Sequence, residues 1–299
     1  MISVLIPVYN YTIIPLVEEL HKQLEASKVT YEIIVWDDAS SEAFHLQNKI
    51  INHVPNIHYF RSESNYGRTK TRQLLYKKSL FDWLLYLDAD VLPKKPEFIQ
   101  NYLNIIPKNY DAVYGGVAYG KIAPKDNMLL RWKYGSNKEE VDAKIRNKKP
   151  YKIVVSGNFM IKRTIFTSIN SKIEDPGYGF DNYFGALLKA DQIKVFHINN
   201  EVYHLGVETN EQFLTKTKEA VDTLLRLYKD RKITTHNNSL LHLFKTLKTS
   251  KTLSLFSTIY KKNHQKMERN LLGKNPSIAL FQLYKISYMC FKYKNHNSK

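Results

Sequence analysis

Short apolar runs alternate with amphipathic stretches along the first 90 residues of the chain. The runs are rich in β-branched and aromatic residues, which predicts buried strands, and they lie at 2–7, 32–36, 57–60 and 83–87. Residues 13–24 place their apolar positions along one side of a helix, and residues 69–79 predict a basic helix. The alternation predicts an α/β fold with a mainly parallel sheet flanked by helices.

The alternation is weaker in the middle of the chain and stops near residue 231. The pattern predicts helices at 96–105, 180–189 and 210–226, and strands at 112–114, 153–155 and 194–198. A polar run at 234–239 marks a boundary, so we expect one domain over 1–230 and a basic helical C-terminal extension over 231–299. Residues 277–291 are apolar but include Gln282 and Lys285, which predicts a segment that lies on a membrane or packs inside rather than spanning.

Polar residues follow three of the predicted strands directly, at 7–10, 37–38 and 88–90. The carboxyl ends of parallel strands meet at one edge of a sheet, where ligands bind. The sequence therefore predicts one cleft lined by these loops. The first of them has no glycine, which disfavours a Rossmann dehydrogenase, and the chain has no Gly-Lys-Ser/Thr phosphate loop, which disfavours a P-loop nucleoside triphosphatase.

The cysteine content and the lack of targeting patterns indicate the cellular compartment in which we expect the protein. The single cysteine, Cys290, excludes an intramolecular disulfide framework and a cysteine-rich zinc site, which fits a reducing compartment. The start of the sequence has no secretory signal pattern and no window is apolar enough to span a bilayer, so we expect a cytoplasmic protein.

The net charge of +17 concentrates near the end of the sequence. Residues 241–299 hold twelve Lys and Arg residues and one acidic residue, Glu268. Such a surface attracts anionic lipid, anionic glycan or nucleic-acid phosphates, and charge alone does not choose among them. We expect peripheral contact with the inner face of the cell membrane through this region, and no nucleic-acid partner.

Four segments in order resemble the motifs of family 2 glycosyltransferases: 3–10, 37–40, 65–68 and 87–90. The resemblance covers roughly residues 1–230 and leaves the basic extension outside. It implies the GT-A fold and the transfer of a sugar from a nucleotide-diphosphate donor to an acceptor hydroxyl.

The resemblance implies a set of residues around the nucleotide. Asp38 is suited to accept the N3 proton of a uracil, so UDP is the favoured nucleotide. Arg72 is either a phosphate ligand or part of a solvated helix face. The residues implied to contact the nucleotide are Pro7, Val8, Tyr9, Asp38, Asn65, Gly67, Arg68, Asp88 and Ala89.

An isolated Asp-X-Asp is common in turns, so residues 88–90 indicate a functional site only in combination with the motifs around them. In the family pattern the first aspartate, Asp88, reaches ribose or sugar, and Asp90 ligates Mn²⁺ or Mg²⁺. A later histidine often completes the metal site, and His204 resembles it, with an unliganded loop histidine as the alternative. His197 has a more structural character.

The acceptor base of the family resembles a Gly-X-X-Glu-Asp pattern, to which residues 178–185 correspond. We assign the base to Asp181, although Asp replaces the usual Glu and Asn182 replaces the usual following Asp. Glu174 and Asp175 form a competing pair a short distance upstream. A general base must come within hydrogen-bond reach of the acceptor hydroxyl, and the sequence does not measure that distance.

Two further segments have both a functional and a structural interpretation. Residues 131–135, Arg-Trp-Lys-Tyr-Gly, have two interpretations. They form a cluster that binds a sugar or an acceptor phosphate, or they lie on a surface helix whose long side chains extend their charged ends into water. Residues 156–158 resemble the strand end that lines the acceptor side, or form an ordinary turn.

Three hypotheses for the function follow. The first is an inverting, metal-dependent transferase that acts on a glycan or lipid-linked acceptor. The second is a sugar nucleotidyltransferase, which releases pyrophosphate. The third is a non-catalytic basic protein that binds lipid or nucleic acid.

Overall fold

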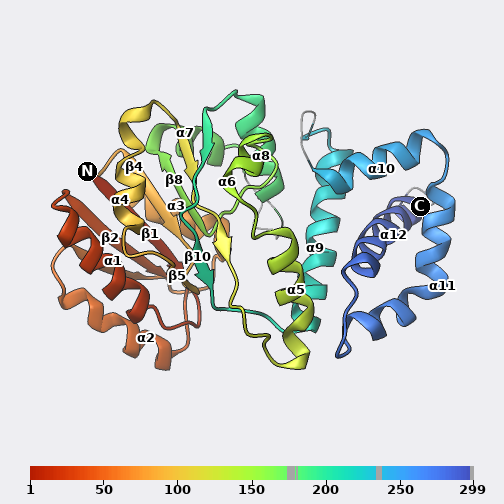
Figure 1. The fold of residues 1–299 in the computed structure, drawn as a ribbon, viewed down its shortest axis with the longest axis horizontal. Coiled ribbons are helices and arrows are strands. Elements are labelled where there is room, and N and C mark those ends of the chain that lie inside the picture. Colours follow the sequence, from red (N-terminus) through yellow and green to blue (C-terminus); the bar gives the residue numbers. More distant parts are fainter. Residues whose placement is uncertain (174–178, 180, 234–237, 297–299) are drawn as a thin grey trace. The chain divides into compact units, whose positions relative to one another are not determined.

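The computed structural model describes residues 1–173, 179, 181–233 and 238–296 (Figure 1). The chain forms two compact units, each assembled from three stretches of sequence. The first unit comprises Met1–Tyr119, Glu140–Pro176 and Asp191–Gly206, and the second comprises Gly120–Glu139, Gly177–Ala190 and Val207–Lys299.

A seven-stranded sheet forms the centre of the first unit. Its strands, in spatial order, are β3 (Ile57–Arg61), β2 (Tyr31–Asp37), β1 (Ile2–Val8), β4 (Trp83–Leu87), β8 (Asn158–Lys162), β6 (Ala112–Tyr114) and β9 (Val195–His197). All neighbouring pairs are parallel except those made by β8, which runs antiparallel to β4 and β6. The prediction of an α/β fold with a mainly parallel sheet is confirmed.

Strand β1 is the point at which the sheet reverses its winding order, because β2 follows it on one side and β4 on the other. In open α/β sheets the loops beyond the carboxyl ends of the strands at such a point hold the ligand. These loops are the ones that follow β1, β2 and β4. A second, three-stranded sheet orders β5 (Val91–Pro93), β10 (Val202–His204) and β7 (Val117–Ala118).

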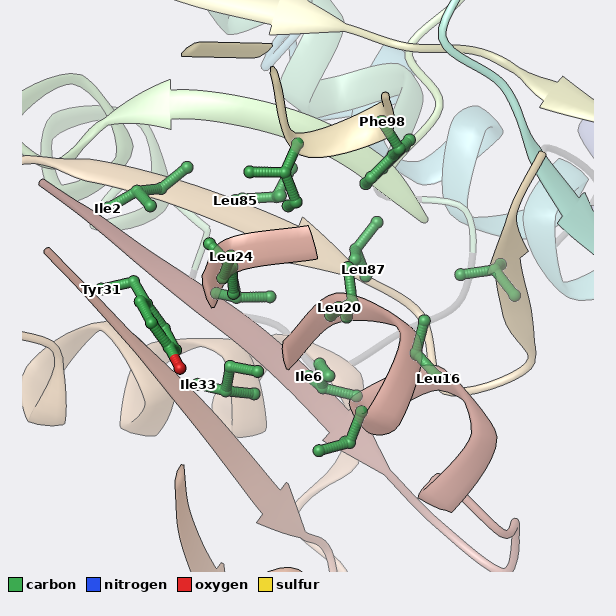
Figure 2. Close-up of a cluster of buried hydrophobic side chains, with 14 of the residues drawn as sticks. Ile2, Ile6, Leu16, Leu20, Leu24, Tyr31, Ile33, Leu85, Leu87 and Phe98 are labelled. Carbon is green, nitrogen blue, oxygen red and sulfur yellow. The ribbon is translucent and has the colours of Figure 1, made fainter. Parts of the chain in front are cut away.

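Helices cover both faces of the central sheet. Leu16, Leu20 and Leu24 of α1 lie over Ile6 of β1 and Leu87 of β4 in one buried cluster (Figure 2). These side chains follow the apolar spacing of the sequence, and burying them supplies the main driving force for this layer. The helices of this unit are α1 (Ile14–Ser27), α2 (Glu42–Asn48), α3 (Gly67–Lys78), α4 (Phe98–Leu103), α6 (Ala143–Asn147) and α7 (Arg163–Asn170), with 3₁₀ turns at Lys49–His53 and Ile106–Lys108.

The opposite face of the sheet is covered by α3 and α7. Tyr86 of β4 is fully buried and stacks on Phe159 and Phe166, with ring centroids 5.1 and 4.7 Å apart. Leu75 of α3 is also completely buried. Alternate residues of β4 thus face different helical layers, as strand geometry requires.

The predicted strand at 153–155 is wrong. These residues have no regular secondary structure, and the strand is instead β8, Asn158–Lys162. β8 pairs with β4 on one side and β6 on the other, and these pairings need neighbours distant in sequence. Residues 156–158 therefore lead into a strand rather than ending one.

The second unit is helical. Tyr284 and Phe281 of α12 are buried, so the apolar segment at 277–291 packs inside this unit. Tyr260 of α11 contacts the rings of Tyr284 and Tyr288, at centroid distances of 5.5 and 5.3 Å. The helices are α5 (Leu129–Lys138), α8 (Asp181–Ala190), α9 (Asn210–Lys229), α10 (Ser239–Thr249), α11 (Leu253–Leu271) and α12 (Ile278–His296), with a 3₁₀ turn at Asp126–Met128.

Among the residues that the structure describes, no helix combines the length and apolar character needed to cross a membrane.

Candidate functional site

The loops after β1 and β2 are joined by hydrogen bonds at the carboxyl edge of the sheet. The Asn10 backbone N–H donates to the Ser40 hydroxyl, and the Ser41 N–H donates to the Asn10 side chain, both at 2.8 Å. Asn10 and Ala39 have φ angles of 49° and 63°, in the left-handed region that non-glycine residues seldom adopt. The reciprocal hydrogen bonds hold this tight geometry.

Asp38 connects the β2 loop to the start of α3. Its carboxylate is 5% exposed and accepts hydrogen bonds from the backbone N–H groups of Tyr66 and Gly67, each at 2.8 Å. Gly67 has a φ of 78°, which glycine adopts without steric cost. Each Asp38 oxygen still has a second lone pair.

Two arginines of α3 converge on Asp88, directly after β4. Arg68 and Arg72 are one helical turn apart, and their guanidinium groups lie 2.5 and 2.8 Å from the two Asp88 carboxylate oxygens. Arg72 also donates to the Ser156 carbonyl at 2.7 Å, and Arg68 to the Ser156 hydroxyl at 3.1 Å. Arg72 is therefore buried in a hydrogen-bonded network and is not part of a solvated helix face.

The arginines keep Asp88 ionised. Burial alone raises the pKa of this carboxyl, but the charges of Arg68 and Arg72 outweigh burial and hold the pKa below its usual range. The Asp88 backbone N–H donates to the Gly157 carbonyl at 3.1 Å, which fixes the turn after β4. Asp88 is thus a permanent anion in a rigid position.

Strand pairing brings Asp90 and His204 together. β5 follows Asp90 and pairs antiparallel with β10, with His204 opposite Val91. The Leu205 N–H donates to the Asp90 carbonyl at 2.8 Å, and the His204 Nε2 lies 3.4 Å from an Asp90 carboxylate oxygen. A Cβ at Gly206 would come within 2.1 Å of that carboxylate, so this close approach requires glycine.

Asp90 and His204 offer two ligands of the types that bind Mn²⁺ or Mg²⁺. Adjacent ligands of an octahedral ion with bonds of about 2.1 Å lie roughly 3 Å apart, which fits their separation. Burial and the neighbouring Asp88 raise the pKa of Asp90, while His204 lowers it, and the net direction is upward. A cation would remove this penalty by stabilising the carboxylate. Within the described residues, no group of three or more His, Cys, Asp and Glu side chains is arranged to hold a metal ion.

The other residues implied around the nucleotide lie at the end of β1 or on the loops after β1, β3 and β4. Tyr9 is 54% exposed, whereas Val8 and Ala89 are buried. Pro7 belongs to β1, and Asn65 is exposed beside the start of α3. Their backbone positions place them at the carboxyl edge of the sheet.

Asn158 belongs to the segment 156–158 that the sequence singled out, but its structural role was not predicted. It is fully buried, and its amide donates to the carbonyls of Gly116 and Asn200 at 2.8 and 2.9 Å, while the Tyr102 hydroxyl donates to it at 2.7 Å. It therefore joins the start of β8 to the chain before β7 and before β10. A polar residue directly before the apolar run of 159–161 was the available signal.

His197 has the structural surroundings expected of it. It is 1% exposed, with Nδ1 2.8 Å from an Arg146 guanidinium nitrogen and Nε2 2.8 Å from the Pro150 carbonyl. The carbonyl accepts only from an N–H, so Nε2 carries the proton and Nδ1 accepts from Arg146. Burial, together with the Arg146 charge, lowers the pKa of His197 to about 4 although the Pro150 hydrogen bond opposes the shift.

Asp181 is the first residue of α8, in the second unit. A carboxylate in the first turn of a helix is favoured by the helix dipole. Asn182 accepts a hydrogen bond from the Asn238 side chain at 2.7 Å. The competing pair, Glu174 and Asp175, lies outside the described residues.

Residues 131–135 lie in the middle of α5 in the second unit, and three of their side chains have partners there. Arg131 pairs with Glu139 at 2.9 Å, and the Trp132 indole donates to the Gly120 carbonyl at 2.8 Å. Lys133 donates to the Asn275 side chain at 2.6 Å. Packing within the unit accounts for much of this basic and aromatic cluster.

Solved structures of glycosyltransferases share the fold. Mannosyltransferase PcManGT from Pyrobaculum calidifontis, solved with GDP-Man and Mn²⁺, aligns with a TM-score of 0.56 and 12% identity over all of this chain and 87% of that one. S. aureus TarS 1-349, solved with UDP-GlcNAc, has a TM-score of 0.53 and 14% identity over 99% and 92% of the two chains. Glucosyl-3-phosphoglycerate synthase from Mycobacterium tuberculosis, solved with Mn²⁺, UDP and phosphoglyceric acid, has a TM-score of 0.53 and 14% identity over 76% and 78%.

Sequence comparison identifies the family. An uncharacterized glycosyltransferase of Haemophilus influenzae is 32% identical over 113 residues, which is 36% of this chain. The match spans about a third of that relative's length, 35%. The sequence model of Glycosyl transferase family 2 matches residues 3–169, more than half of the chain. The chain, which has the GT-A fold of its structural neighbours, therefore belongs to glycosyl transferase family 2.

Proposed function

We propose that the chain transfers a sugar from a UDP-sugar to a hydroxyl of a glycan or lipid-linked acceptor, with inversion and with a bound Mn²⁺ or Mg²⁺. The observation that carries the proposal is the turn of residues 88–90. Asp88 faces the arginines of α3, and Asp90 lies beside His204. The guanidinium groups of α3 and a cation held by Asp90 and His204 would together neutralise the negative charge of a departing diphosphate.

Asp90 and His204 would hold the metal ion. The ion, when bound, stabilises the negative charge that develops on the leaving diphosphate. The Arg68 side chain is 40% exposed, so it is accessible to a phosphate oxygen. Arg72 keeps Asp88 oriented through its second hydrogen bond to Ser156.

The nucleotide preference rests on the loops after β1 and β2. Asp38 retains lone pairs that accept the N3 proton of uracil, and the exposed ring of Tyr9 is available to contact the base. Solved neighbours with UDP or UDP-GlcNAc support this preference, whereas the neighbour with GDP-Man keeps guanosine as the alternative to test.

Asp181 is the proposed general base, by its correspondence to the family pattern. In an inverting transfer it takes the proton of the acceptor hydroxyl while that oxygen attacks the anomeric carbon and the diphosphate leaves. We propose that residues 1–230 carry this chemistry and that residues 231–299 form an appended extension.

A donor screen tests the nucleotide and the metal. The thermal unfolding midpoint of the full chain is measured with UDP, GDP and their sugars, with and without Mn²⁺. We expect UDP with Mn²⁺ to raise the midpoint most, because a ligand that binds only the folded state stabilises it by mass action. Stabilisation by GDP alone contradicts the uridine assignment. Release of pyrophosphate from UTP and a sugar phosphate identifies a nucleotidyltransferase instead.

Substitution of the base tests the mechanism. Asp181→Asn is expected to lower kcat by about 10²- to 10⁴-fold while donor binding persists, since general base catalysis contributes on that order. Glu174→Gln and Asp175→Asn are the matched controls and are expected to retain turnover. The reverse pattern assigns the base to the upstream pair, and an α product from an α-linked donor contradicts inversion.

A further inference from the structure

Helix α11 has two different faces. On the inner face, Tyr260, Met267 and Leu271 are buried. Tyr260 packs against the rings of α12, including Phe291 at a centroid distance of 5.0 Å. This face holds the helix in the second unit, so it is not available to a partner.

The outer face of α11 carries an exposed stripe that we call the α11 stripe: Leu255, Lys262, Lys266 and Arg269. All four side chains are exposed, and Leu255 is 60% exposed. Their spacing of seven, four and three residues places them along one side of a helix. Lys261 adds a further exposed ammonium group next to the stripe.

In the described part of the chain, no acidic side chain forms an ion pair with the stripe. Glu268, the acidic residue of 241–299, turns away from it and accepts hydrogen bonds from Lys218 at 2.8 Å and from Tyr284 at 2.5 Å. Within the described residues, none of the three stripe cations forms an ion pair. The stripe therefore presents an uncompensated positive charge to solvent.

We propose that the α11 stripe docks this protein on an anionic lipid bilayer, with the helix parallel to the membrane surface. Lysine and arginine side chains near an anionic surface add attraction with each charge, and an exposed leucine among them inserts at the boundary between headgroups and acyl chains. This surface contact goes beyond the proposed transfer reaction and does not require it.

The chemistry of the stripe fits lipid better than nucleic acid. Proteins that bind single strands combine positive charge with exposed aromatic rings on which bases stack. The aromatic side chains of α11 and α12 lie inward or are only partly exposed in the described residues. The exposed apolar side chain on the stripe is instead aliphatic, which favours contact with acyl chains.

Vesicle cosedimentation of the full chain tests the proposal. The vesicles contain phosphatidylcholine with roughly one-third phosphatidylglycerol, or phosphatidylcholine alone. We expect the wild type to bind the anionic vesicles and to be released as salt rises, because ionic screening weakens surface electrostatics. The triple variant Lys262→Glu, Lys266→Glu, Arg269→Glu is expected to bind at least about tenfold more weakly.

A matched control separates the stripe from net charge. Lys144, Lys148 and Lys149 are exposed in the first unit, and their change to glutamate alters the charge by the same amount. We expect this control to bind within about threefold of the wild type. The neutral variant Lys262→Gln, Lys266→Gln, Arg269→Gln is expected to bind with intermediate strength and to keep the unfolding midpoint of the wild type. It tests the proposal even if the charge-reversed variant does not fold.

Three outcomes overturn the proposal. The first is wild-type binding that is equal on anionic and neutral vesicles. The second is an equal loss of binding in the control and in the stripe variant. The third is tighter binding to a nucleic-acid oligonucleotide that the stripe variant abolishes. Each is independent of transfer activity, so failure here leaves the proposed reaction standing.

Discussion

Arg72 in the first unit and Lys285 in the second are both cations surrounded by protein, but their environments differ. Arg72 lies over the Tyr86 ring, 5.9 Å from its centroid, and also bonds to the Asp88 carboxylate and a backbone carbonyl. Lys285 lies over the rings of Tyr134 and Phe281, at 4.8 and 4.9 Å, and no ion pair is formed by it within the described residues.

The difference separates a network of opposite charges at the proposed site from a contact made by packing. A paired guanidinium keeps its charge and fixes its carboxylate partner, which is useful where charge develops in a reaction. Burial lowers the pKa of Lys285 to about 8, although Glu139 opposes the shift, so this ammonium is held at a cost to stability. The first unit gathers opposite charges at strand ends, whereas the second packs aliphatic stems and rings between helices.

The largest expected effect is on the proposed metal ligand. Asp90→Ala is expected to lower kcat/KM for sugar transfer by about 10²-fold or more and to remove the stabilisation of the protein by Mn²⁺, because the carboxylate ligand is lost. Asp126→Ala, which removes an exposed carboxylate of the second unit, is the control and should leave both properties unchanged. Equal losses in the two variants would contradict the assignment of the metal ligand to Asp90.

The second effect concerns the pairing of Arg72. Arg72→Met leaves Asp88 with one guanidinium partner, so the pKa of Asp88 should rise, and the free energy of unfolding should fall by about 1–3 kcal/mol. Arg68→Met should cost less than about 1 kcal/mol, because that side chain is more exposed. Urea unfolding measures both. If the two variants lose equal stability, burial does not distinguish the two arginines.

The third effect is an acid sensitivity of the first unit. The pKa of His197 is about 4 in the folded protein and has an ordinary value of 6.5, so the unfolded chain binds the proton first as pH falls. The free energy of unfolding should therefore decrease between pH 6.5 and 4, by up to roughly 3 kcal/mol. His197→Gln should flatten this dependence, whereas His58→Gln, at an exposed site, should not. An unchanged slope in the first variant would assign the acid sensitivity elsewhere.

The smallest expected effect concerns Lys285 in the second unit. Lys285→Met should raise the free energy of unfolding at pH 7 by about 1 kcal/mol, because it removes a desolvated charge whose cost the two ring contacts offset only in part. Wild-type stability should rise between pH 8 and 10.5, where folded Lys285 has lost its proton and the unfolded chain has not, and the variant should lack this rise. Lys292→Met, which removes a partner of Asp222, should be destabilising or neutral instead.

The local pattern of apolar and polar residues was sufficient to predict the strands and the helix around the loops at 7–10, 37–38 and 88–90. Strands β1, β2 and β4 and helix α1 follow from short apolar runs and one-sided apolar spacing. Predicted helix boundaries differ from the observed ones where hydrogen bonds at the helix end decide them. Helix α3 begins at Gly67 rather than at residue 69, because Asp38 accepts hydrogen bonds from the backbone N–H groups at its start. The run at 153–155 has the composition of a strand, but residues 158–162 are the ones that find partners in β4 and β6.

The amino-acid sequence was enough to place carboxylates directly after two of the predicted strands, those ending at residues 36 and 87, because the period of a strand and its breakers are local properties. The tertiary fold sets which distant side chains meet them. Asp90 meets His204 through the antiparallel register of β5 and β10, and Asp88 meets Arg72 through the docking of α3 on the sheet. Backbone hydrogen bonds between strands and the packing of buried faces set these contacts. The period of the residues shows which face of an element is buried, but not which partner that face meets.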